Sequence, residues 1–204
     1  MSAIDSQNKI NPYLADPAVI LMLEFQKGDN TSFEKLMVLY YPRILNFINR
    51  FVGRRQVAED LTQEVFIKVY HSAASYKPQS KFQTWIYTIA KNISLNELRK
   101  YKNSTVSLDG TFATEDDELK KQWEDLDAKK PGQDLVEEEV VSQIKAAIDE
   151  LPENQKMAVI LLRYEQLSYD EIAATMNLSM QAVKSLLSRA KENLKVKLAN
   201  LVNE

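Results

Sequence analysis

The sequence predicts an all-α protein of two helical modules, an N-terminal helical bundle and a C-terminal helix-turn-helix bundle, joined by a flexible acidic linker. Apolar residues recur at helical spacing over most of the chain, and the alternation typical of strands is almost absent. Between residues 103 and 134 this periodicity stops, and Ser, Thr, Gly, Pro and charged residues dominate. The expected boundaries are 17–102 for the N-terminal module, 103–134 for the linker and 135–204 for the C-terminal module.

Local signals predict the helices of the N-terminal module. Capping boxes, in which two side chains accept the free amides of a first turn, predict helix starts at Thr31 and Ser80. Pro42 should kink or restart the helix in which it lies, because it lacks an amide hydrogen, and Gly53 can end that helix. The expected helices cover about 17–27, 31–53, 56–74 and 80–102.

The composition argues against an enzyme. The 204 residues include no Cys, which excludes disulfides, thiolate metal sites and a cysteine nucleophile, and His71 is the sole histidine. The four Gly are too scattered for a phosphate-binding loop. We therefore expect no catalytic residues, no metal, no cofactor and no small-molecule substrate.

Two features predict a cytoplasmic protein. The longest apolar run, 18–23, ends at Glu24, whereas a membrane span needs about 18–20 apolar residues. The first residues lack the basic start and apolar core of a signal peptide.

The net charge of −3 conceals an uneven arrangement of charges. Segment 65–101 has six basic residues against one acidic residue, and segment 180–197 has five against one. Segment 102–137 has ten acidic residues against five basic ones. The two basic segments are candidates for contact with nucleic acid, and ordinary solvated helix faces are the alternative.

A helix-turn-helix is predicted in the C-terminal module. Ser168 and Glu171 form another capping box, Asn177 tolerates a left-handed turn, and Ser179 can cap a longer helix over 180–198. The second helix would lie in the major groove with its N-terminal residues at base edges, whereas a plain αα-hairpin is the alternative. The residues expected to contact DNA are Ser179, Gln181, Lys184, Ser185, Ser188 and Arg189.

Three runs of sequence resemble a known family. The run YYPRILNFINRF precedes AEDLTQEVF at 58–66, and FQTWIYTIAKN follows at 82–92. In this order, with a helix-turn-helix after an acidic linker, they resemble the extracytoplasmic-function sigma factors, the small two-module members of the bacterial sigma-70 family. The resemblance covers about residues 17–200.

The resemblance assigns polymerase binding to the AEDLTQEVF segment. In the family this segment binds the clamp helices of the RNA polymerase β′ subunit, and the β subunit is a further expected contact. Asp60, Gln63 and Glu64 would form an exposed acidic ridge suited to a basic coiled coil. A solvated helix face is the alternative.

The next segment suits DNA that has been opened. Aromatic residues lie among lysines here, and bases stack on such rings for roughly 1–3 kcal/mol each. In the family the loop here takes a flipped base from the minus-ten element, and the following helix contacts the non-template strand. Trp85 shares a helix face with Ile89, so a position in the core is as compatible with the sequence as a role in stacking on a base. The implied minus-ten residues are Tyr76, Lys77, Phe82, Trp85, Lys91, Asn92, Asn96 and Arg99.

For the C-terminal module, the resemblance implies recognition of the minus-thirty-five element. Leu186 stands where relatives commonly have a basic residue, and Lys184 where Arg is frequent, so the base preference stays open. The acidic linker would thread the active-site and RNA-exit channels of polymerase.

The sequence thus predicts a sigma factor that binds core RNA polymerase and directs promoter-specific initiation, while polymerase supplies the chemistry. Its expected partners are core RNA polymerase, promoter DNA and an anti-sigma factor. The alternative function is a stand-alone helix-turn-helix regulator whose N-terminal module serves dimerisation or sensing.

Overall fold

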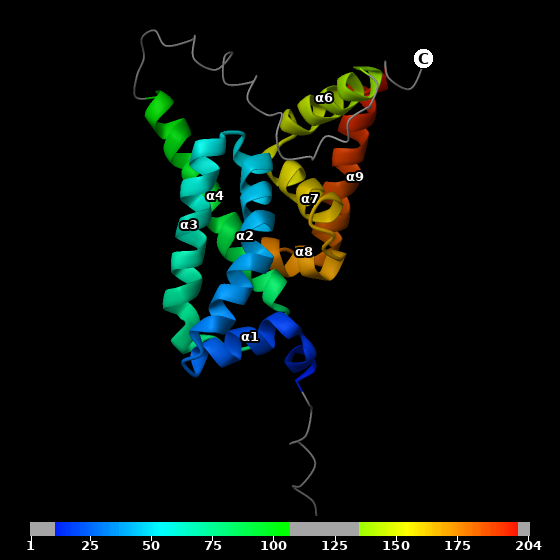
Figure 1. Ribbon diagram of the computed structural model, residues 1–204. Helices are drawn as coiled ribbons and strands as arrows, with labels where there is room; N and C mark the ends of the chain where they lie inside the picture. Colours follow the sequence, from blue (N-terminus) through cyan, green and yellow to red (C-terminus); the bar gives the residue numbers. More distant parts are fainter. Residues whose placement is uncertain (1–10, 107–134, 200–204) are drawn as a thin grey trace, which may run out of the picture.

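A computed structural model of the protein describes residues 11–106 and 135–199 (Figure 1). These residues form helices and no strands, which confirms the all-α prediction. The predicted linker lies largely at 107–134, outside the described residues. The elements are η1 (Pro12–Ala15), α1 (Pro17–Gln26), α2 (Asn30–Val52), α3 (Arg55–Ser72), η2 (Ala73–Ser75), α4 (Phe82–Val106), α6 (Leu135–Asp149), α7 (Glu153–Arg163), α8 (Tyr169–Met176) and α9 (Met180–Lys197).

The start of α2 differs from the predicted capping box. Asp29 is the N-cap, and its carboxylate accepts the amide of Thr31 at 3.0 Å, so Thr31 already lies inside the helix. Pro42 does not interrupt α2, because Tyr40 and Ile44 on either side of it are buried and their packing outweighs the local cost of about 3 kcal/mol. Gly53 ends the helix with a φ of 83°, as predicted.

The capping box predicted at Ser80 is also absent, because α4 begins at Phe82 and is capped from elsewhere in the chain. The amide of Phe82 donates to Asp16 Oδ2 at 3.0 Å, and the other carboxylate oxygen accepts the amide of Ala18 at 3.0 Å. One aspartate therefore caps both α1 and α4. At its other end α4 continues to Val106, inside the range predicted as linker.

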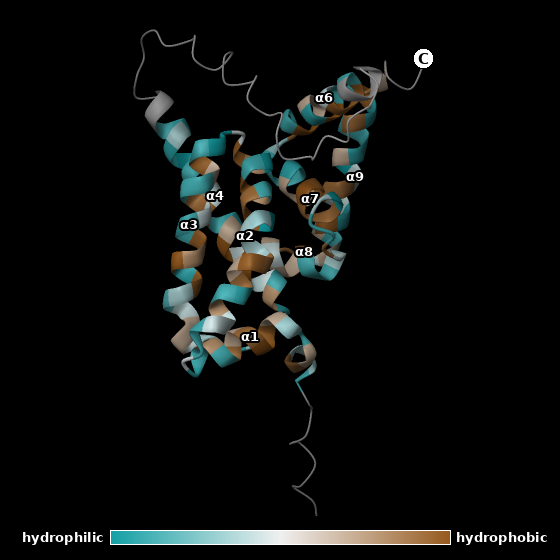
Figure 2. Ribbon diagram, in the orientation of Figure 1, coloured by the Kyte–Doolittle hydropathy of each residue, from teal (hydrophilic) through white to brown (hydrophobic). Residues whose placement is uncertain are grey.

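The N-terminal module packs α1, α2, α3 and α4 around a common core (Figure 1). In Figure 2, hydrophobic and hydrophilic residues are interspersed along α2 and α3, as expected of helices with one buried face. The largest fully buried side chains of this module are Tyr87, Phe47, Phe51, Phe82, Met22, Leu36, Ile44, Ile48 and Ile86.

The C-terminal module packs directly on the N-terminal module. Helix α8 lies against α4 and α7 against α2, while α9 crosses α7 and α8 on the far side (Figure 1). Buried residues of the C-terminal module, including Ile160, Leu161 and Ile172, belong to the same apolar cluster as the N-terminal core. The two modules are thus closed on each other, an arrangement that no local sequence pattern indicates.

Within the described residues, no helix combines the length and the apolarity that crossing a membrane requires. In the same ranges, histidine and carboxylate side chains form no group of three that could hold a metal ion.

Candidate functional site

An exposed ridge on α3 carries the predicted polymerase-binding residues. Asp60, Gln63 and Glu64 all face solvent, while the residues between and behind them are buried. We call these three residues the α3 ridge. Ile67, one helical turn further along the same face, is 55% exposed and was missed by the sequence analysis. Its position three residues after Glu64 was the signal that could have identified it.

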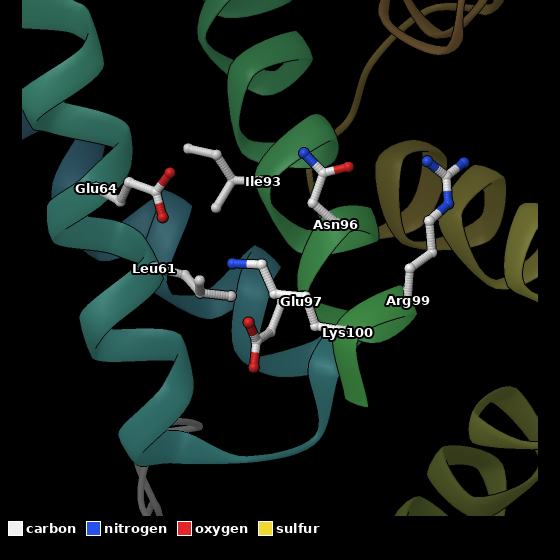
Figure 3. A pocket seen from close by; sticks show the side chains of 7 residues that line it. All are labelled: Leu61, Glu64, Ile93, Asn96, Glu97, Arg99 and Lys100. Carbon is white, nitrogen blue, oxygen red and sulfur yellow. The ribbon is translucent and has the colours of Figure 1, made fainter. Parts of the chain in front are cut away.

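A hollow of about 270 Å³ separates α3 from α4 (Figure 3). Glu64 stands on its α3 wall, and Asn96 and Arg99 stand on α4, so the structure brings together residues predicted for two different partners. Glu97, which also lines the hollow, pairs with Arg54 at 3.7 Å. The polymerase and minus-ten predictions therefore fall on two walls of one surface depression.

Three polar residues form an exposed stripe along α4. Asn92, Asn96 and Arg99 are spaced four and three residues apart, which places them on one helix face, and all three are exposed. We call them the α4 stripe. Lys91, by contrast, is buried, and desolvation lowers the pKa of its ammonium group. In this conformation Lys91 is not positioned at the surface to contact a phosphate.

Two of the predicted base-stacking rings lie in the core. Tyr76 and Phe82 are buried, and their rings contact one another and Trp85, with centroids 4.9 Å apart for Tyr76 and Trp85 and 5.6 Å for Phe82 and Trp85. The Phe82 ring also contacts the Tyr40 ring, with centroids 5.0 Å apart. Because these faces are occupied, Tyr76 and Phe82 offer no ring to a base here, whereas Trp85 is partly exposed.

The Tyr76 hydroxyl is buried without a hydrogen-bond partner. Burial and, to a smaller extent, the nearby negative charge of Asp16 together raise the pKa of Tyr76 to about 12. A buried hydroxyl without a hydrogen-bond partner is energetically costly.

The loop before α4 is tied to the N-terminal residues. The Asn11 amide donates to the carbonyl of Pro78 at 2.8 Å, and the Gln26 amide donates to the carbonyls of Ala73 at 2.9 Å and Tyr76 at 3.2 Å. Lys77 projects from this loop and is exposed, as its predicted role requires. The sequence analysis missed Asn11 and Gln26, because bonds over such separations leave no local pattern.

The predicted helix-turn-helix is present. Ser168 and Glu171 form the reciprocal capping box, with Ser168 N donating to Glu171 Oε2 at 2.8 Å and Glu171 N to Ser168 Oγ at 3.3 Å. Asn177 takes the left-handed conformation with a φ of 55°, and Ser179 Oγ accepts the amide of Ala182 at 3.2 Å. Val183 is fully buried at the junction of the two helices.

The start of α9 presents a mixed polar and apolar surface. Ser179, Gln181, Lys184, Ser188 and Arg189 are exposed as predicted. Ser185 is partly buried, and its hydroxyl donates to the carbonyl of Gln181 at 3.0 Å. The sequence analysis missed the exposed apolar residues here, which are Leu178 and Met180. Apolar side chains at this position of a recognition helix can contact thymine methyl groups.

Family models match both modules. The model for Sigma-70 region 2 matches residues 36–104, and the model for Sigma-70 region 4 matches residues 142–194. The first range contains the α3 ridge and the α4 stripe, and the second contains the helix-turn-helix.

Relatives match across both modules. RNA polymerase sigma-H factor of Pseudomonas aeruginosa is 34% identical over 189 residues, which cover 90% of this chain and 95% of the relative. The extracytoplasmic-function sigma-E factor of Escherichia coli is 32% identical over 183 residues, with the same coverage of 90% and 95%.

Solved structures show the same fold. The sigma factor RpoE of Bartonella quintana, crystallised with the anti-sigma factor NepR, superimposes with a TM-score of 0.63 at 26% identity, covering 82% of this chain and 96% of that one. CnrH, in complex with the cytosolic domain of CnrY, gives a TM-score of 0.65 at 16% identity over 89% of this chain and 96% of that one. With both modules matched in the order predicted, the chain belongs to the extracytoplasmic-function sigma factors of the bacterial sigma-70 family.

Proposed function

We propose that this sigma factor directs promoter-specific initiation through three groups of residues: the α3 ridge for core polymerase, the α4 stripe for the minus-ten element and the start of α9 for the minus-thirty-five element. The observation that carries the proposal is the capped helix-turn-helix with an exposed recognition helix, in one chain with a matched region 2. The comparisons lend no support to a stand-alone regulator.

The α3 ridge suits a basic partner. Its two carboxylates and one amide lie on a helix anchored by the buried Leu61, Val65 and Phe66, so they are held in a fixed row. Ile67 adds an apolar contact at the end of this row, and buried apolar anchors among polar groups are typical of binding hot spots. The proposed partner is the clamp-helix coiled coil of β′, with the β subunit as a further contact.

The two DNA surfaces match two kinds of DNA. The amides of Asn92 and Asn96 can both donate to and accept from the edges of unpaired bases, and Arg99 can hold a phosphate. At the start of α9, Gln181 can pair with adenine and Lys184 with guanine or with a phosphate in the major groove. We assign opened minus-ten DNA to α4 and duplex minus-thirty-five DNA to α9.

Sigma factors in general are not enzymes, and catalysis is assigned here to the polymerase. RpoE was crystallised with the anti-sigma factor NepR, and CnrH was solved in complex with the cytosolic domain of CnrY. By analogy we assign an anti-sigma factor to this chain as well, and its site of action to the cytoplasm, where core polymerase acts.

The polymerase surface is tested by reconstitution. The triple variant Asp60→Ala, Gln63→Ala, Glu64→Ala should weaken binding to purified core polymerase by about tenfold or more, and promoter-dependent transcription should fall with it. The control variant, Glu34→Ala with Glu192→Ala, removes the same acidic charge from exposed sites on α2 and α9. Equal binding by both variants would exclude the α3 ridge as the docking surface.

The minus-thirty-five surface is tested by selection from randomised promoters. Exchanging the side chains through Gln181→Lys with Lys184→Gln should change the preferred base at a few positions, because each direct contact discriminates by about 1–3 kcal/mol. Lys195→Gln, further along α9, should weaken binding to all sequences without changing the preference. An unchanged preference in the exchanged variant would place the recognition surface elsewhere.

A further inference from the structure

We propose that Asn11, Asp16 and Gln26 are positioning residues, which fix the loop before α4 for contact with the minus-ten element. We call residues 73–81, between α3 and α4, the minus-ten loop. The inference rests on the proposed function, because this loop leads directly into the helix that carries the α4 stripe. It assigns a task to η1 and α1, which contribute no residue to the α3 ridge, the α4 stripe or the start of α9.

The side chain of Gln26 holds the first half of the minus-ten loop. Gln26 is the last residue of α1. Its amide nitrogen donates to the carbonyl oxygens of Ala73 at 2.9 Å, Ala74 at 3.2 Å and Tyr76 at 3.2 Å. Carbonyl oxygens that converge on one point repel each other, and a donor between them offsets the repulsion. Gln26 therefore favours this one course of the loop backbone over others.

Asn11 and Asp16 hold the second half of the loop. The side-chain amide of Asn11 donates to the carbonyl of Pro78 at 2.8 Å. Asp16 Oδ2 accepts the amide of Phe82, which is the first residue of α4, at 3.0 Å. Asn11 is itself the N-cap of η1, and Asp16 is the N-cap of α1. The loop is thus anchored at both of its ends by side chains that have fixed places in the N-terminal helices.

The helix that carries these anchors is firmly packed. Val19 and Met22 of α1 are fully buried, and Ala18 and Phe25 are nearly so. In Figure 1, α1 lies across one end of the bundle, and it contacts α2, η2 and α4. A residue can position a binding loop when its own place is fixed by packing, and α1 meets this condition.

The minus-ten loop depends on these anchors because its own backbone bonds are short-range. The amide of Tyr76 donates to the carbonyl of Ala73 at 3.1 Å, and the amide of Gln79 donates to that of Lys77 at 2.8 Å. Pro78 has no amide hydrogen to donate. Bonds that span two or three residues define single turns, and the path of the whole loop is left to contacts from elsewhere in the chain.

The anchored carbonyls leave a loop face that suits a DNA strand. Four carbonyl oxygens of the loop accept donors from Asn11 and Gln26, whereas Lys77 and Gln79 are exposed. A phosphate repels carbonyl oxygens and attracts the ammonium group of Lys77, and the amide of Gln79 can donate or accept at a base edge. Because the loop is already ordered, binding of the opened strand avoids the entropic cost of fixing it.

The inference is tested with Gln26→Ala in the full-length protein bound to core polymerase. The template is a promoter that the parent protein selects from randomised sequences, with 2-aminopurine in the minus-ten element to report opening by its fluorescence. The variant should open this promoter about tenfold more slowly, because a loop without its anchor samples other conformations. Its affinity for core polymerase should stay unchanged, since α1 lies outside the α3 ridge.

The base preference separates positioning from a general loss of stability. Selection repeated with Gln26→Ala should give a weaker preference at one or more minus-ten positions and an unchanged preference at the minus-thirty-five element. An unfolded fraction of the protein would instead lower activity on all sequences alike and change neither preference. Asp29→Ala is the matched control, because it removes the N-cap of α2 three residues after Gln26 and leaves the donors to the loop in place. It should keep both preferences of the parent.

Conservative replacements test whether the hydrogen-bond donor is what matters. Gln26→Lys places an ammonium group with three donors near the same three carbonyls, and it should restore both the opening rate and the minus-ten preference. Gln26→Glu offers only acceptors to these carbonyls and should open the promoter no faster than Gln26→Ala. Asn11→Ala removes one bond at the other end of the loop and should slow opening about threefold.

The outcomes distinguish the inference from the proposed function. The inference is overturned if Gln26→Ala keeps the minus-ten preference of the parent, or if its affinity for core polymerase falls as far as its opening rate. Equal behaviour of Gln26→Lys and Gln26→Ala would overturn it as well. If the parent protein neither binds core polymerase nor initiates at any selected promoter, the proposed function itself is wrong.

Discussion

Asp16 caps two helices at once, which leads to a quantitative prediction. Its two carboxylate oxygens accept the amide of Ala18 at the start of α1 and the amide of Phe82 at the start of α4, each at 3.0 Å. Asp16→Ala removes an N-cap worth about 1 kcal/mol and leaves a second, partly buried amide unsatisfied, which costs about 1–2 kcal/mol more. We expect a total loss of about 2–3 kcal/mol in the free energy of unfolding.

Thermal unfolding monitored by circular dichroism measures this loss. For a chain of this length, 1 kcal/mol corresponds to about 2–4 °C, so the midpoint should fall by about 5–10 °C. The midpoint of Asp16→Asn should lie between those of the parent and Asp16→Ala, because its one side-chain amide oxygen can still accept one backbone amide.

Asp29→Ala is the comparison variant, because Asp29 caps only one helix, α2, and its hydrogen bonds to Thr31 are exposed. Its effect on the midpoint should be clearly smaller. If Asp16→Ala destabilises the protein no more than Asp29→Ala does, the double cap contributes nothing and the start of α4 is stabilised by other contacts.

Three further predictions follow from single contacts. Asn177→Val should destabilise the helix-turn-helix by about 1–2 kcal/mol, because a β-branched residue disfavours the left-handed φ of 55°, whereas Asn177→Gly should be nearly neutral; urea unfolding distinguishes them. Arg189→Ala should reduce the slope of log affinity against log salt by about one at the minus-thirty-five element, and an unchanged slope would show that Arg189 contacts no phosphate. Glu165→Gln should reduce the pH dependence of the packing between the two modules, because Glu165 is buried where they meet.

The sign of that pH dependence follows from burial. In the closed form desolvation raises the pKa of Glu165 above its usual 4.5, although Tyr87 on α4 and the Arg43 and Arg50 charges on α2 oppose the shift. Packing of the two modules therefore favours the protonated carboxyl. The contribution of Glu165 to the stability of the packed form is fully present below its usual pKa. It is lost as the pH rises through the raised pKa. Energy transfer between dyes attached to the two modules, at Lys68→Cys on α3 and Glu192→Cys on α9, should therefore decrease with rising pH. An equal decrease in Glu165→Gln would assign the effect to another group.

Signals within a few residues were sufficient for the helix-turn-helix. The bonds of Ser168 and Glu171, the left-handed Asn177 and the cap at Ser179 each involve neighbours at most four residues apart. Such interactions form in the same way whatever the rest of the chain does, so the pattern alone predicts them. The exposure of the α3 ridge followed in the same way from helical periodicity.

The same reasoning was insufficient for the minus-ten segment. An aromatic residue near a lysine is equally compatible with a stacking surface and with a core, and packing placed Tyr76 and Phe82 in the core. The polar residues of the α4 stripe carried no such ambiguity, because the cost of burying an unpaired amide or guanidinium keeps them at the surface.

The sequence by itself therefore determined the all-α class, the helix-turn-helix and the family, because these depend on local hydrogen bonds and on the period of apolar residues. Only the tertiary structure decided how distant residues meet. Asp16 caps a helix that begins 66 residues later, and Glu165 bonds to Tyr87 across 78 residues. Neither pairing leaves a local pattern, because it arises from apolar surfaces of separate helices that must be buried against each other.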